Sequence, residues 1–383
     1  MILETLFLFT LVLLLNSYLL YPILIILMAK RKKNPELSAT GLSVSILISA
    51  YNEEKVIRQR IENIDLLDYN KDLLEVIVGS DCSSDNTNRI LMDLALQYTW
   101  LKVHIFQKRR GKAAVINDLA QKAGNNILIF SDANTVFDKS ALKNLINKFH
   151  NDRIGGVSGR LILSDENVTT ESVEEKKYWL LETLIKQAEG KLGILIGANG
   201  GIFAIRRELF TPIPIEKAVT DDFFLSLSVL SKGYKFLYAN DAVANENVAN
   251  DVISEFKRKR RFAATNYQTL SFFKNLLFNK NLLLSYAFWS HKVLRWFLPF
   301  QLIIILMLNT ILLSSGVLFE VLFYIQITVY TFASIGFLLS LMKVRIILFS
   351  LPYFFIVTNL ALLAGIYKFL RKGHSVIWES TPR

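Results

Sequence analysis

Four long segments without a charged residue constrain this chain more than any other feature of its sequence. These segments are residues 5–29, 297–319, 321–342 and 346–367. A helix of roughly 20 apolar residues crosses a hydrocarbon layer of about 30 Å, so each segment is long enough to span a membrane. The 52% share of hydrophobic residues in the whole chain is too high for a purely soluble protein. We therefore expect a membrane protein with a soluble region between the first and second segments.

The first apolar segment is interpreted as a membrane anchor rather than as a cleaved signal peptide. Glu4 stands where a signal peptide carries basic residues, the apolar stretch is longer than a signal-peptide core, and it lacks a small-residue cleavage site. We expect residues 1–33 to form a transmembrane helix with a basic flank. Residues 297–369 are expected to form further transmembrane helices, followed by a tail at 370–383.

The positive charge of the chain lies largely beside these apolar segments. The formal net charge is +11, and basic residues cluster within residues 30–33, 257–261 and 368–372. This is the positive-inside pattern, and it predicts a multi-pass protein of the cell membrane (inner or plasma membrane) whose soluble middle region is cytoplasmic. It also argues against nucleic acid as a partner. One span before that domain and three after it would place the basic tail outside, so either one late segment is re-entrant or the charge rule fails here.

Cysteine and histidine are too sparse to indicate a disulfide framework or a zinc site. Cys82 is the single cysteine, which agrees with a reducing compartment. The four histidines fall in no metal-ligand spacing with cysteine or with each other. A zinc enzyme is therefore not expected.

Between the anchor and the later spans, short apolar strands alternate with amphipathic helices. The expected strands are residues 44–50, 75–80, 103–106 and 127–131, and the expected helices are 53–67, 86–98, 113–123 and one through 142–149. This alternation predicts an α/β domain over residues 34–273 with a mainly parallel sheet, whose ligands bind at the carboxyl ends of the strands. Residues 274–296 mix aromatic and basic side chains, so they are expected to form an interfacial amphipathic helix in contact with membrane lipids.

Acidic residues follow three of the expected strands. Glu53, Asp81 and Asp132 come at or just after the ends of the first, second and fourth strands. One such residue alone is more often a turn former or a helix cap, but three at the same edge of a sheet favour a ligand site. The glycine-rich dinucleotide fingerprint and the P-loop are both absent. The remaining common ligand is a nucleotide held by aspartate, with its diphosphate neutralised by a divalent cation.

The motifs of this middle region resemble those of the family 2 glycosyltransferases, which have a GT-A fold and include cellulose, chitin and hyaluronan synthases. The resemblance covers roughly residues 44–262, with the motifs in the family's order. The matching segments are residues 50–54 and 80–87 for the nucleotide, 108–113 for the donor pocket, 131–134 for the metal, 197–201 for the sugar and acceptor pocket, 220–222 for catalysis and 258–262 for the diphosphate. Such an ordered set is far more specific than any single motif.

The resemblance implies a role for each matching residue. The implied donor-binding residues are Ala50, Tyr51, Asn52, Glu53, Asp81, Lys112 and Asp132. The implied acceptor- and diphosphate-binding residues are Asn199, Gly200, Arg258, Arg261 and Phe262. Asp132 and Asn134 are implied to hold Mg²⁺ or Mn²⁺. Asp222 is implied to be the general base of the catalytic motif, while its neighbour Asp221 can also cap the helix that follows.

Four positions depart from the family pattern. Cys82 replaces a glycine, Asn134 replaces the second aspartate of the metal motif, and Arg258 and Phe262 replace glutamine and tryptophan. An amide oxygen can still ligate a hard cation, so the metal site remains expected. The changes at Arg258 and Phe262 weaken the expectation of processive synthesis. The basic run at 257–261 has an equally weighted alternative role as a surface that binds lipid headgroups.

The function implied by the resemblance is inverting transfer of a sugar from a nucleotide-sugar, with UDP-linked hexose or N-acetylhexosamine as the expected donor. The expected acceptor is a glycan or a lipid-linked molecule, in polysaccharide or glycolipid synthesis, with polysaccharide export or synthase proteins as possible partners. One alternative is a transferase that loads a single sugar onto a polyprenyl phosphate. The other is an inactive scaffold of a polysaccharide export complex, which the departures at Asn134 and Phe262 favour.

Overall fold

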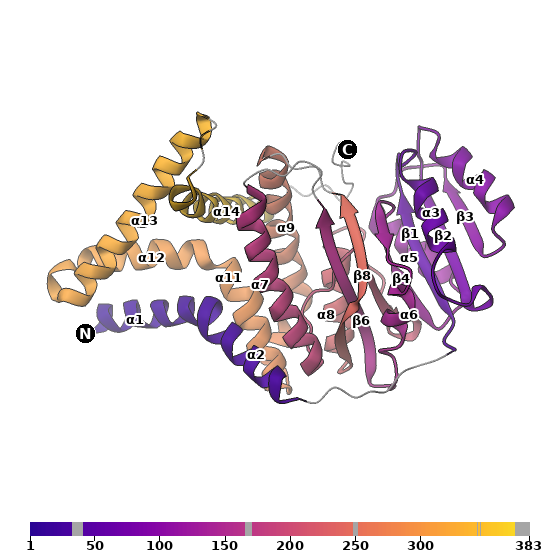
Figure 1. Cartoon of the computed structure of the whole chain (residues 1–383). Coiled ribbons are helices and arrows are strands. Elements are labelled where there is room, and N and C mark those ends of the chain that lie inside the picture. The colour runs from indigo at the N-terminus through magenta and orange to yellow at the C-terminus, as the bar shows by residue number, and fades with distance from the viewer. Residues whose placement is uncertain (33–40, 165–170, 248–251, 343, 345, 372–383) are drawn as a thin grey trace.

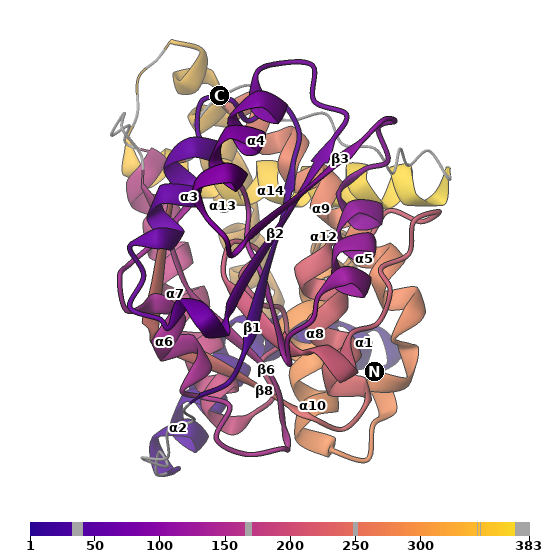
Figure 2. The same ribbon diagram turned by 90° about the vertical axis from the view of Figure 1, so that its right-hand side faces the viewer.

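An eight-stranded sheet forms the centre of the region between the first and the later apolar helices (Figures 1 and 2). The computed structural model describes residues 1–32, 41–164, 171–247, 252–342, 344 and 346–371, with the side chains of 163–179 and 247–258 outside the described part. The strands are β1 Val44–Ala50, β2 Leu74–Asp81, β3 Leu101–Phe106, β4 Ile127–Phe130, β5 Thr135–Phe137, β6 Ile154–Ser164, β7 Phe203–Arg206 and β8 Lys235–Asn247. Their order in the sheet is β3-β2-β1-β4-β7-β6-β8-β5.

The sheet is mixed but mostly parallel, which confirms the predicted fold class. Strands β1 to β4 pair in parallel, as do β6 and β8. Strand β7 runs antiparallel to β4 and β6, and β5 runs antiparallel to β8. The four expected strands thus correspond to the parallel half, with bounds that differ by at most two residues. The other four strands, β5 to β8, which include both antiparallel and parallel pairs, were not predicted from the sequence.

Helices cover both faces of the sheet, because successive residues of a buried strand point to opposite sides. The flanking helices are α3 Ile57–Asp65, α4 Thr87–Gln97, α5 Lys112–Lys122, α6 Ala141–Ile146 and α8 Asp221–Ser231. Ile46 and Ile48 of β1 belong to the core that α3, α4 and α6 cover, whereas Leu47 belongs to the core under α5 and α8. Figure 2 shows α3 and α5 on opposite sides of the strands. The carboxyl ends of β1, β2 and β4 are left between these two layers of helices.

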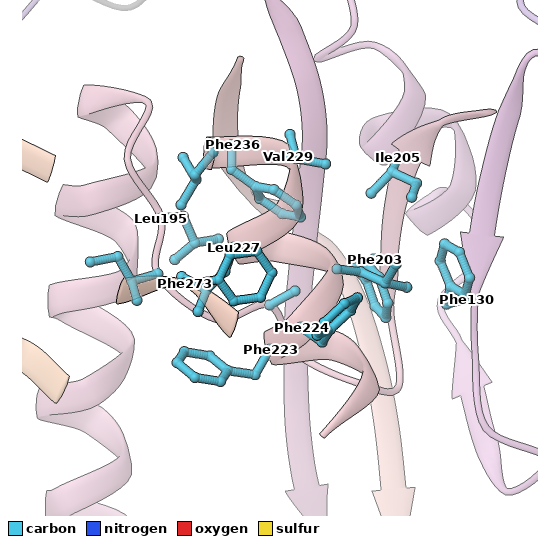
Figure 3. Close-up of a cluster of buried hydrophobic side chains, with 14 of the residues drawn as sticks. Phe130, Leu195, Phe203, Ile205, Phe223, Phe224, Leu227, Val229, Phe236 and Phe273 are labelled. Carbon is cyan, nitrogen blue, oxygen red and sulfur yellow. The ribbon is translucent and has the colours of Figure 1, made fainter. Parts of the chain in front are cut away.

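An aromatic core fixes helix α8 against the centre of the sheet (Figure 3). Phe130 of β4 stacks on Phe203 of β7 with a centroid separation of 4.6 Å, and Phe224 of α8 packs edge-on against Phe273 at 5.2 Å. Burial of one such side chain contributes about 1.5–3 kcal/mol. Because α8 is held by these rings, its first turn, with Asp221 and Asp222, has a defined place at the rim of the sheet.

Three helices are long and apolar enough to cross a membrane: Ile2–Arg31, α13 Val317–Leu341 and α14 Ile347–Leu370. The first consists of α1 Ile2–Leu15, the π-helical turn η1 Asn16–Leu20 and α2 Tyr21–Arg31. Helix α7, Glu171–Leu192, and helix α9, Val252–Phe272, lie between the sheet and these apolar helices (Figure 1). Tyr21, Ile25 and Ala29 of α2 are buried in the same core as the sheet residues. The first apolar helix is therefore packed onto the α/β domain.

The second expected span, residues 297–319, is not a continuous helix. Helix α12, Leu298–Ile311, is followed by the short 3-10 turn η6, Leu313–Ser315, and by Gly316 with a positive φ of 153°. The helical segment Leu282–Trp296 precedes α12, and the axes of the two differ by 69°. They therefore count as a fourth span only if they are taken together. Pro299 accounts for the break, because proline lacks the N–H that would bond to the carbonyl of Arg295, and its ring clashes with that carbonyl.

The segment 274–296 also differs from the single amphipathic helix that was expected. It comprises η4 Lys274–Phe278, α10 Leu282–Ala287, the π-helical turn η5 Phe288–Val293 and α11 Leu294–Trp296. His291, Arg295 and Trp296, which were expected to face lipid headgroups, have only 1%, 8% and 6% of their surface exposed. The polar side-chain atoms of His291 and Arg295 bind protein partners, and this requirement overrides the amphipathic pattern.

Candidate active site

One lysine connects two of the predicted site carboxylates. Lys112 is the first residue of α5, and its Nζ lies 2.7 Å from Asp132 Oδ1 and 2.8 Å from Asp221 Oδ2. Asp132 follows β4 and Asp221 begins α8, so three separate motifs meet at one ammonium group. Burial alone would lower the pKa of Lys112, but the charges of Asp132 and Asp221 outweigh it and raise this pKa well above its usual value. The lysine is therefore a fixed positive charge.

Asp81 shapes the turn that delivers Lys112. Its Oδ1 accepts a hydrogen bond from the backbone N–H of Arg110 at 2.7 Å, and its Oδ2 accepts one from Gly111 at 2.8 Å. Gly111 has a φ of 86°, a conformation that glycine adopts at little cost. Both oxygens of the buried Asp81 carboxylate thus bind the backbone. The structure gives Asp81 a positioning role, and its contact with a donor stays a prediction.

The first two nucleotide motifs are hydrogen-bonded to each other. Asn52 has a φ of 54°, and its Oδ1 accepts a hydrogen bond from Ser84 N at 2.8 Å. The backbone N–H of Glu53 donates to Thr87 Oγ1 at 2.8 Å. Asparagine tolerates this left-handed conformation better than most residues. The two loops therefore form one rigid wall beyond the ends of β1 and β2.

An aromatic ring with a cation on its face lies on that wall. The Arg109 guanidinium carbon is 3.6 Å from the centroid of the Tyr51 ring, which is a close cation–π contact. Ala50, at the end of β1, is fully buried and supports this loop from below. Flat groups of this kind can stack on a nucleobase. Arg109 was not among the residues singled out in the sequence, although it belongs to the predicted 108–113 segment.

Asp222 is held close to the glycine-rich loop. Its Oδ1 accepts a hydrogen bond from Phe223 N at 2.6 Å, and a Cβ added at Gly200 would lie 3.2 Å from its Oδ2. Burial raises the pKa of Asp222 to about 7, and the neighbouring charge of Asp221 adds to the shift. A carboxylate with this pKa can accept a proton near neutral pH.

Asp221, which the sequence offered as a helix cap, is the first residue of α8 rather than its cap. Thr220 is the N-cap residue, and no side chain caps the helix from that position. Asp221 instead pairs with Lys112, because a nearby ammonium satisfies its carboxylate, while Asp222 binds the first-turn amide of Phe223.

The remaining acceptor-side predictions have mixed outcomes. The Asn199 side chain donates to Gly159 O at 2.7 Å and accepts from Lys186 Nζ at 2.6 Å, next to Gly200. Arg261 and Phe262 lie on α9 about one turn before Thr265, whose Oγ1 is 2.8 Å from Thr220 Oγ1. They are thus near the start of α8. The side chain of Arg258 lies outside the described residues.

The oxygens at the predicted metal motif suit a hard cation. Asn134 Nδ2 donates to Glu246 Oε1 at 3.0 Å, while Asn134 Oδ1 is buried without a hydrogen-bond partner. A buried unpartnered oxygen is costly unless something binds it, and Mg²⁺ and Mn²⁺ take oxygen ligands. Within the described part of the chain, no cluster of three or more His, Cys, Asp or Glu side chains forms a complete metal site. The residues therefore fit a cation that completes its ligands from the substrate.

Arg60 is a further site residue that the motifs did not reveal. Its guanidinium is buried, donates to Ser131 Oγ at 2.9 Å and lies over the Phe137 ring at 4.2 Å. Burial lowers the pKa of Arg60 to about 9, an effect that the nearby charge of Asp132 opposes. The signal was present in the sequence, because Arg60 falls on the apolar face that Ile57, Ile61 and Ile64 define.

A buried ionic network beside the site was also missed. Helix α7 contributes Glu182 and Glu189, and the segment before α12 contributes His291 and Arg295. His291 lies between the two carboxylates, with Nε2 3.0 Å from Glu182 Oε2 and Nδ1 2.6 Å from Glu189 Oε1. The Tyr21 hydroxyl donates to Glu189 Oε1 at 2.5 Å. The spacing of Glu182, Lys186 and Glu189 on one helical face was the available sequence signal.

Comparison with known proteins agrees with the geometry. The sheet order and the strand-end site define the GT-A fold, and the solved structure of a mannosyltransferase from Pyrobaculum calidifontis, in complex with GDP-Man and Mn²⁺, superposes with a TM-score of 0.71. That structure is 20% identical and is matched over 95% of this chain and 99% of its own. The family model "Glycosyl transferase family 2" matches residues 45–212. These residues therefore form a glycosyltransferase family 2 domain.

Two curated relatives extend beyond the region they share with this chain. A probable glycosyltransferase, YdaM, of Bacillus subtilis is 30% identical over 246 residues, which is 60% of this chain and 56% of the relative. The poly-beta-1,6-N-acetyl-D-glucosamine synthase of Staphylococcus aureus is 24% identical over 242 residues, which is 62% of this chain and 58% of the relative. The matched region thus spans somewhat more than half the length of these relatives.

Proposed function

We propose that the chain transfers a sugar, with inversion, from a nucleotide-sugar to a glycan or lipid-linked acceptor at the cytoplasmic face of the cell membrane. The observation that carries this proposal is the cluster in which Lys112 joins Asp132 to Asp221, with Asp222 beside it. A donor diphosphate needs a fixed positive charge, and an acceptor hydroxyl needs a nearby base. This site offers both within one rim of the sheet.

Each side chain has a defined part in the proposed reaction. Asp222 accepts the proton of the acceptor hydroxyl as that oxygen attacks the anomeric carbon, and the bond to the nucleoside diphosphate breaks. Lys112 holds Asp132 and Asp221 in place and supplies positive charge on the donor side. Asp132 and Asn134 Oδ1 would hold Mg²⁺ or Mn²⁺, which would neutralise charge on the departing diphosphate. Tyr51 and Arg109 offer a stacking surface for the base.

The donor proposed is a UDP-linked hexose or N-acetylhexosamine. Its support is the resemblance of the matched domain to the N-acetyl-D-glucosamine polymer synthase. A GDP-linked donor is the competing choice, since the P. calidifontis mannosyltransferase was solved with GDP-Man. Both donors present the same diphosphate, so the proposed mechanism does not depend on the base.

The three long apolar helices support a membrane topology consistent with the charges. With Ile2–Arg31, α13 and α14 as spans, the catalytic domain and the end of α14 lie on the same side. The basic residues Lys30, Lys368 and Arg371 then all face the cytoplasm, as the positive-inside rule demands. The bent segment through α12 is left out of this count, and its far end lies beside the amino-terminal end of the first helix, where Phe319 packs edge-on against Phe7 at 5.3 Å.

A transfer assay with the purified full chain tests the proposed function. Radiolabelled UDP- and GDP-sugars are supplied with Mg²⁺ or Mn²⁺ and a membrane lipid extract, and products are separated by partition into organic solvent. A lipid-linked monosaccharide enters the organic phase, whereas an extended glycan does not. Turnover that is lost in Asp222→Asn supports the proposal. A wild-type chain that turns over no donor would instead indicate the scaffold alternative.

A further inference from the structure

A carboxylate from the edge of the sheet contacts the predicted metal motif. Glu246 belongs to β8 and lies opposite Thr135 in the antiparallel pairing of β8 with β5. Asn134 directly precedes Thr135, so this register brings the Glu246 side chain within reach of it. Asn134 Nδ2 donates a hydrogen bond to Glu246 Oε1 at 3.0 Å. A residue outside the family motifs therefore contacts one of the two residues expected to hold the cation.

The contact with Glu246 determines which way the Asn134 amide points. An ionised carboxylate can only accept hydrogen bonds, so the amide nitrogen of Asn134 faces it and the amide oxygen faces away. That oxygen, Asn134 Oδ1, is buried and has no hydrogen-bond partner among the residues that the structure describes. Glu246 thus leaves free the Asn134 atom that can ligate a hard cation.

The metal-motif loop is also fixed at both of its ends by helix α3. At its start, Arg60 Nη2 donates to Ser131 Oγ at 2.9 Å. At its other end, Asn63 Oδ1 accepts the backbone N–H of Phe137 at 2.9 Å, and Asn63 Nδ2 donates to the carbonyl of the same residue at 2.8 Å. Helix α3 therefore holds the backbone of the loop, and the contact with Glu246 acts on the orientation of one side chain.

The charges around Asp132 give a further carboxylate a second task. Asp132 Oδ1 accepts a hydrogen bond from Lys112 Nζ at 2.7 Å, so its charge is already shared with an ammonium group. The guanidinium of Arg60 adds another positive charge near Asp132. Because Asn134 is neutral, a divalent cation bound here needs negative charge from a neighbouring side chain, and Glu246 provides it.

Outer partners of this kind are a general feature of metal sites. Such a partner fixes the orientation of the ligand, and its hydrogen bond makes the metal-binding atom of that ligand more basic. Changing the outer partner typically lowers metal affinity by about 10- to 100-fold. Glu246 has this position relative to Asn134, because it binds the amide nitrogen and leaves the amide oxygen unpaired.

We propose that Glu246 is a positioning residue of the cation site, which orients the Asn134 amide and supplies the negative charge that an amide lacks. This inference rests on the proposed function only in placing a divalent cation at Asp132 and Asn134. It implies that the asparagine of the metal motif is not the mark of an inactive scaffold. Asn134 and Glu246 together offer an oxygen ligand and a negative charge, which a second aspartate would combine in one side chain.

Binding of Mn²⁺ tests this proposal without relying on turnover. The full chain in detergent is titrated with Mn²⁺ in the presence of UDP or GDP, and free Mn²⁺ is measured by electron paramagnetic resonance. A protein-free titration corrects for the Mn²⁺ that the nucleotide binds. Glu246→Gln keeps an acceptor for the Asn134 amide and loses the charge, so its dissociation constant for Mn²⁺ should rise by about tenfold or more. Its thermal midpoint without metal should stay close to that of the wild type, because α3 holds the loop.

A double variant separates the charge from the fold of the loop. Asn134→Asp combined with Glu246→Gln moves the carboxylate to position 134 and the amide to position 246. The hydrogen bond between the two side chains can then form with donor and acceptor exchanged. This chain should bind Mn²⁺ at least as tightly as the wild type, although it carries the same change at position 246 as the weakened single variant.

Asp138→Asn is the matched control for the loss of a carboxylate. Asn245 Nδ2 donates to Asp138 Oδ1 at 3.1 Å, which is the same kind of amide–carboxylate contact. Asp138 follows the far end of β5, so its replacement should leave the Mn²⁺ affinity within error of the wild type. The proposal is wrong if Glu246→Gln binds Mn²⁺ as tightly as the wild type, or if the double variant stays as weak as Glu246→Gln. An equal loss of affinity in Asp138→Asn would also refute it, because the effect would then be a general one of surface charge.

The two proposals fail in different ways in these experiments. A chain whose Mn²⁺ affinity depends on Glu246 and that transfers no sugar supports this inference and refutes the proposed catalysis. A chain that transfers sugar while it binds no Mn²⁺, or binds it with an affinity independent of Glu246, does the opposite.

Discussion

Replacing Lys112 with methionine would remove the charge that joins Asp132 to Asp221 while keeping the length of the side chain. The lysine makes two charge-assisted contacts, at 2.7 and 2.8 Å, and both carboxylates lose their shared counter-ion in the variant. A hydrogen bond to a charged group contributes about 1.5–3 kcal/mol, and solvent screening at this partly exposed site reduces the sum. We expect the free energy of unfolding to fall by about 1–3 kcal/mol.

The sharper consequence of Lys112→Met concerns Asp222. The charge of Lys112 lowers the pKa of Asp222, opposing the effects of burial and of Asp221. Removing that charge should raise the pKa, so that the rising limb of kcat/KM against pH moves to higher pH than in the wild type. Transfer of labelled sugar, measured from pH 5 to pH 9, gives this limb directly. The residual rate of the variant at its optimum should also fall, because the donor side loses a fixed positive charge.

The matched control is Lys122→Met, an exposed lysine at the other end of the same helix α5. It should leave both the pH profile and the unfolding midpoint within error of the wild type. If the limb of Lys112→Met stays in place or moves to lower pH, then Lys112 does not act on Asp222 and the electrostatic account of the site is wrong.

Three further predictions follow from the same geometry. Asp222→Asn should lower kcat by about 10²- to 10⁴-fold. Because the pKa of Asp222 is raised to about 7 in the folded state, ionisation of this carboxyl lowers the stability of the wild type as pH rises from about 4 to 7. The variant should therefore melt at a higher temperature than the wild type at pH 8. Gly200→Ala places a Cβ 3.2 Å from Asp222 Oδ2, and small displacements of a reacting group are costly. This variant should therefore lower kcat by roughly tenfold and leave the KM for the donor unchanged. Steady-state kinetics in which only KM changes would contradict this. EDTA should abolish turnover, and added Mn²⁺ should restore it. In a Mn²⁺ titration, Asn134→Ala should raise the concentration that gives the half-maximal rate by about tenfold.

The parallel half of the sheet could be predicted because its information is local. Each strand from β1 to β4 is a short apolar run followed by a helix or a turn signal, so chain order and pattern suffice. The strands β6, β7 and β8 pair across long stretches of chain, and β6 begins with Ile154-Gly155-Gly156. Glycine is required at position 156 because a Cβ there would overlap the Phe236 ring. That requirement is visible only in the folded sheet.

The candidate site also has a part that the sequence predicts and a part that only the folded structure shows. The proximity of Lys112, Asp132 and Asp221 could be expected, since each follows a strand or begins a helix at one edge of the sheet. The exact partners of Asp81, which binds the backbone, and of Asp221, which pairs with Lys112, could not be predicted, because several partners were available to each carboxylate. Glu246 belongs to no motif. Its place depends on how β5 and β8 pair at the edge of the sheet, and pairing between distant segments is not encoded by a short pattern.

The burial of Tyr21 has a practical consequence for work on this protein. A common route to a soluble catalytic domain is to delete the membrane helix at the polar linker, here after residue 32. In this chain, that cut would strip Tyr21, Ile25 and Ala29 from the hydrophobic core and leave Glu189 without its hydroxyl partner. The amino-terminal helix is thus a structural wall of the transferase domain, and expression of residues 41–272 alone should yield an aggregating product rather than a smaller enzyme.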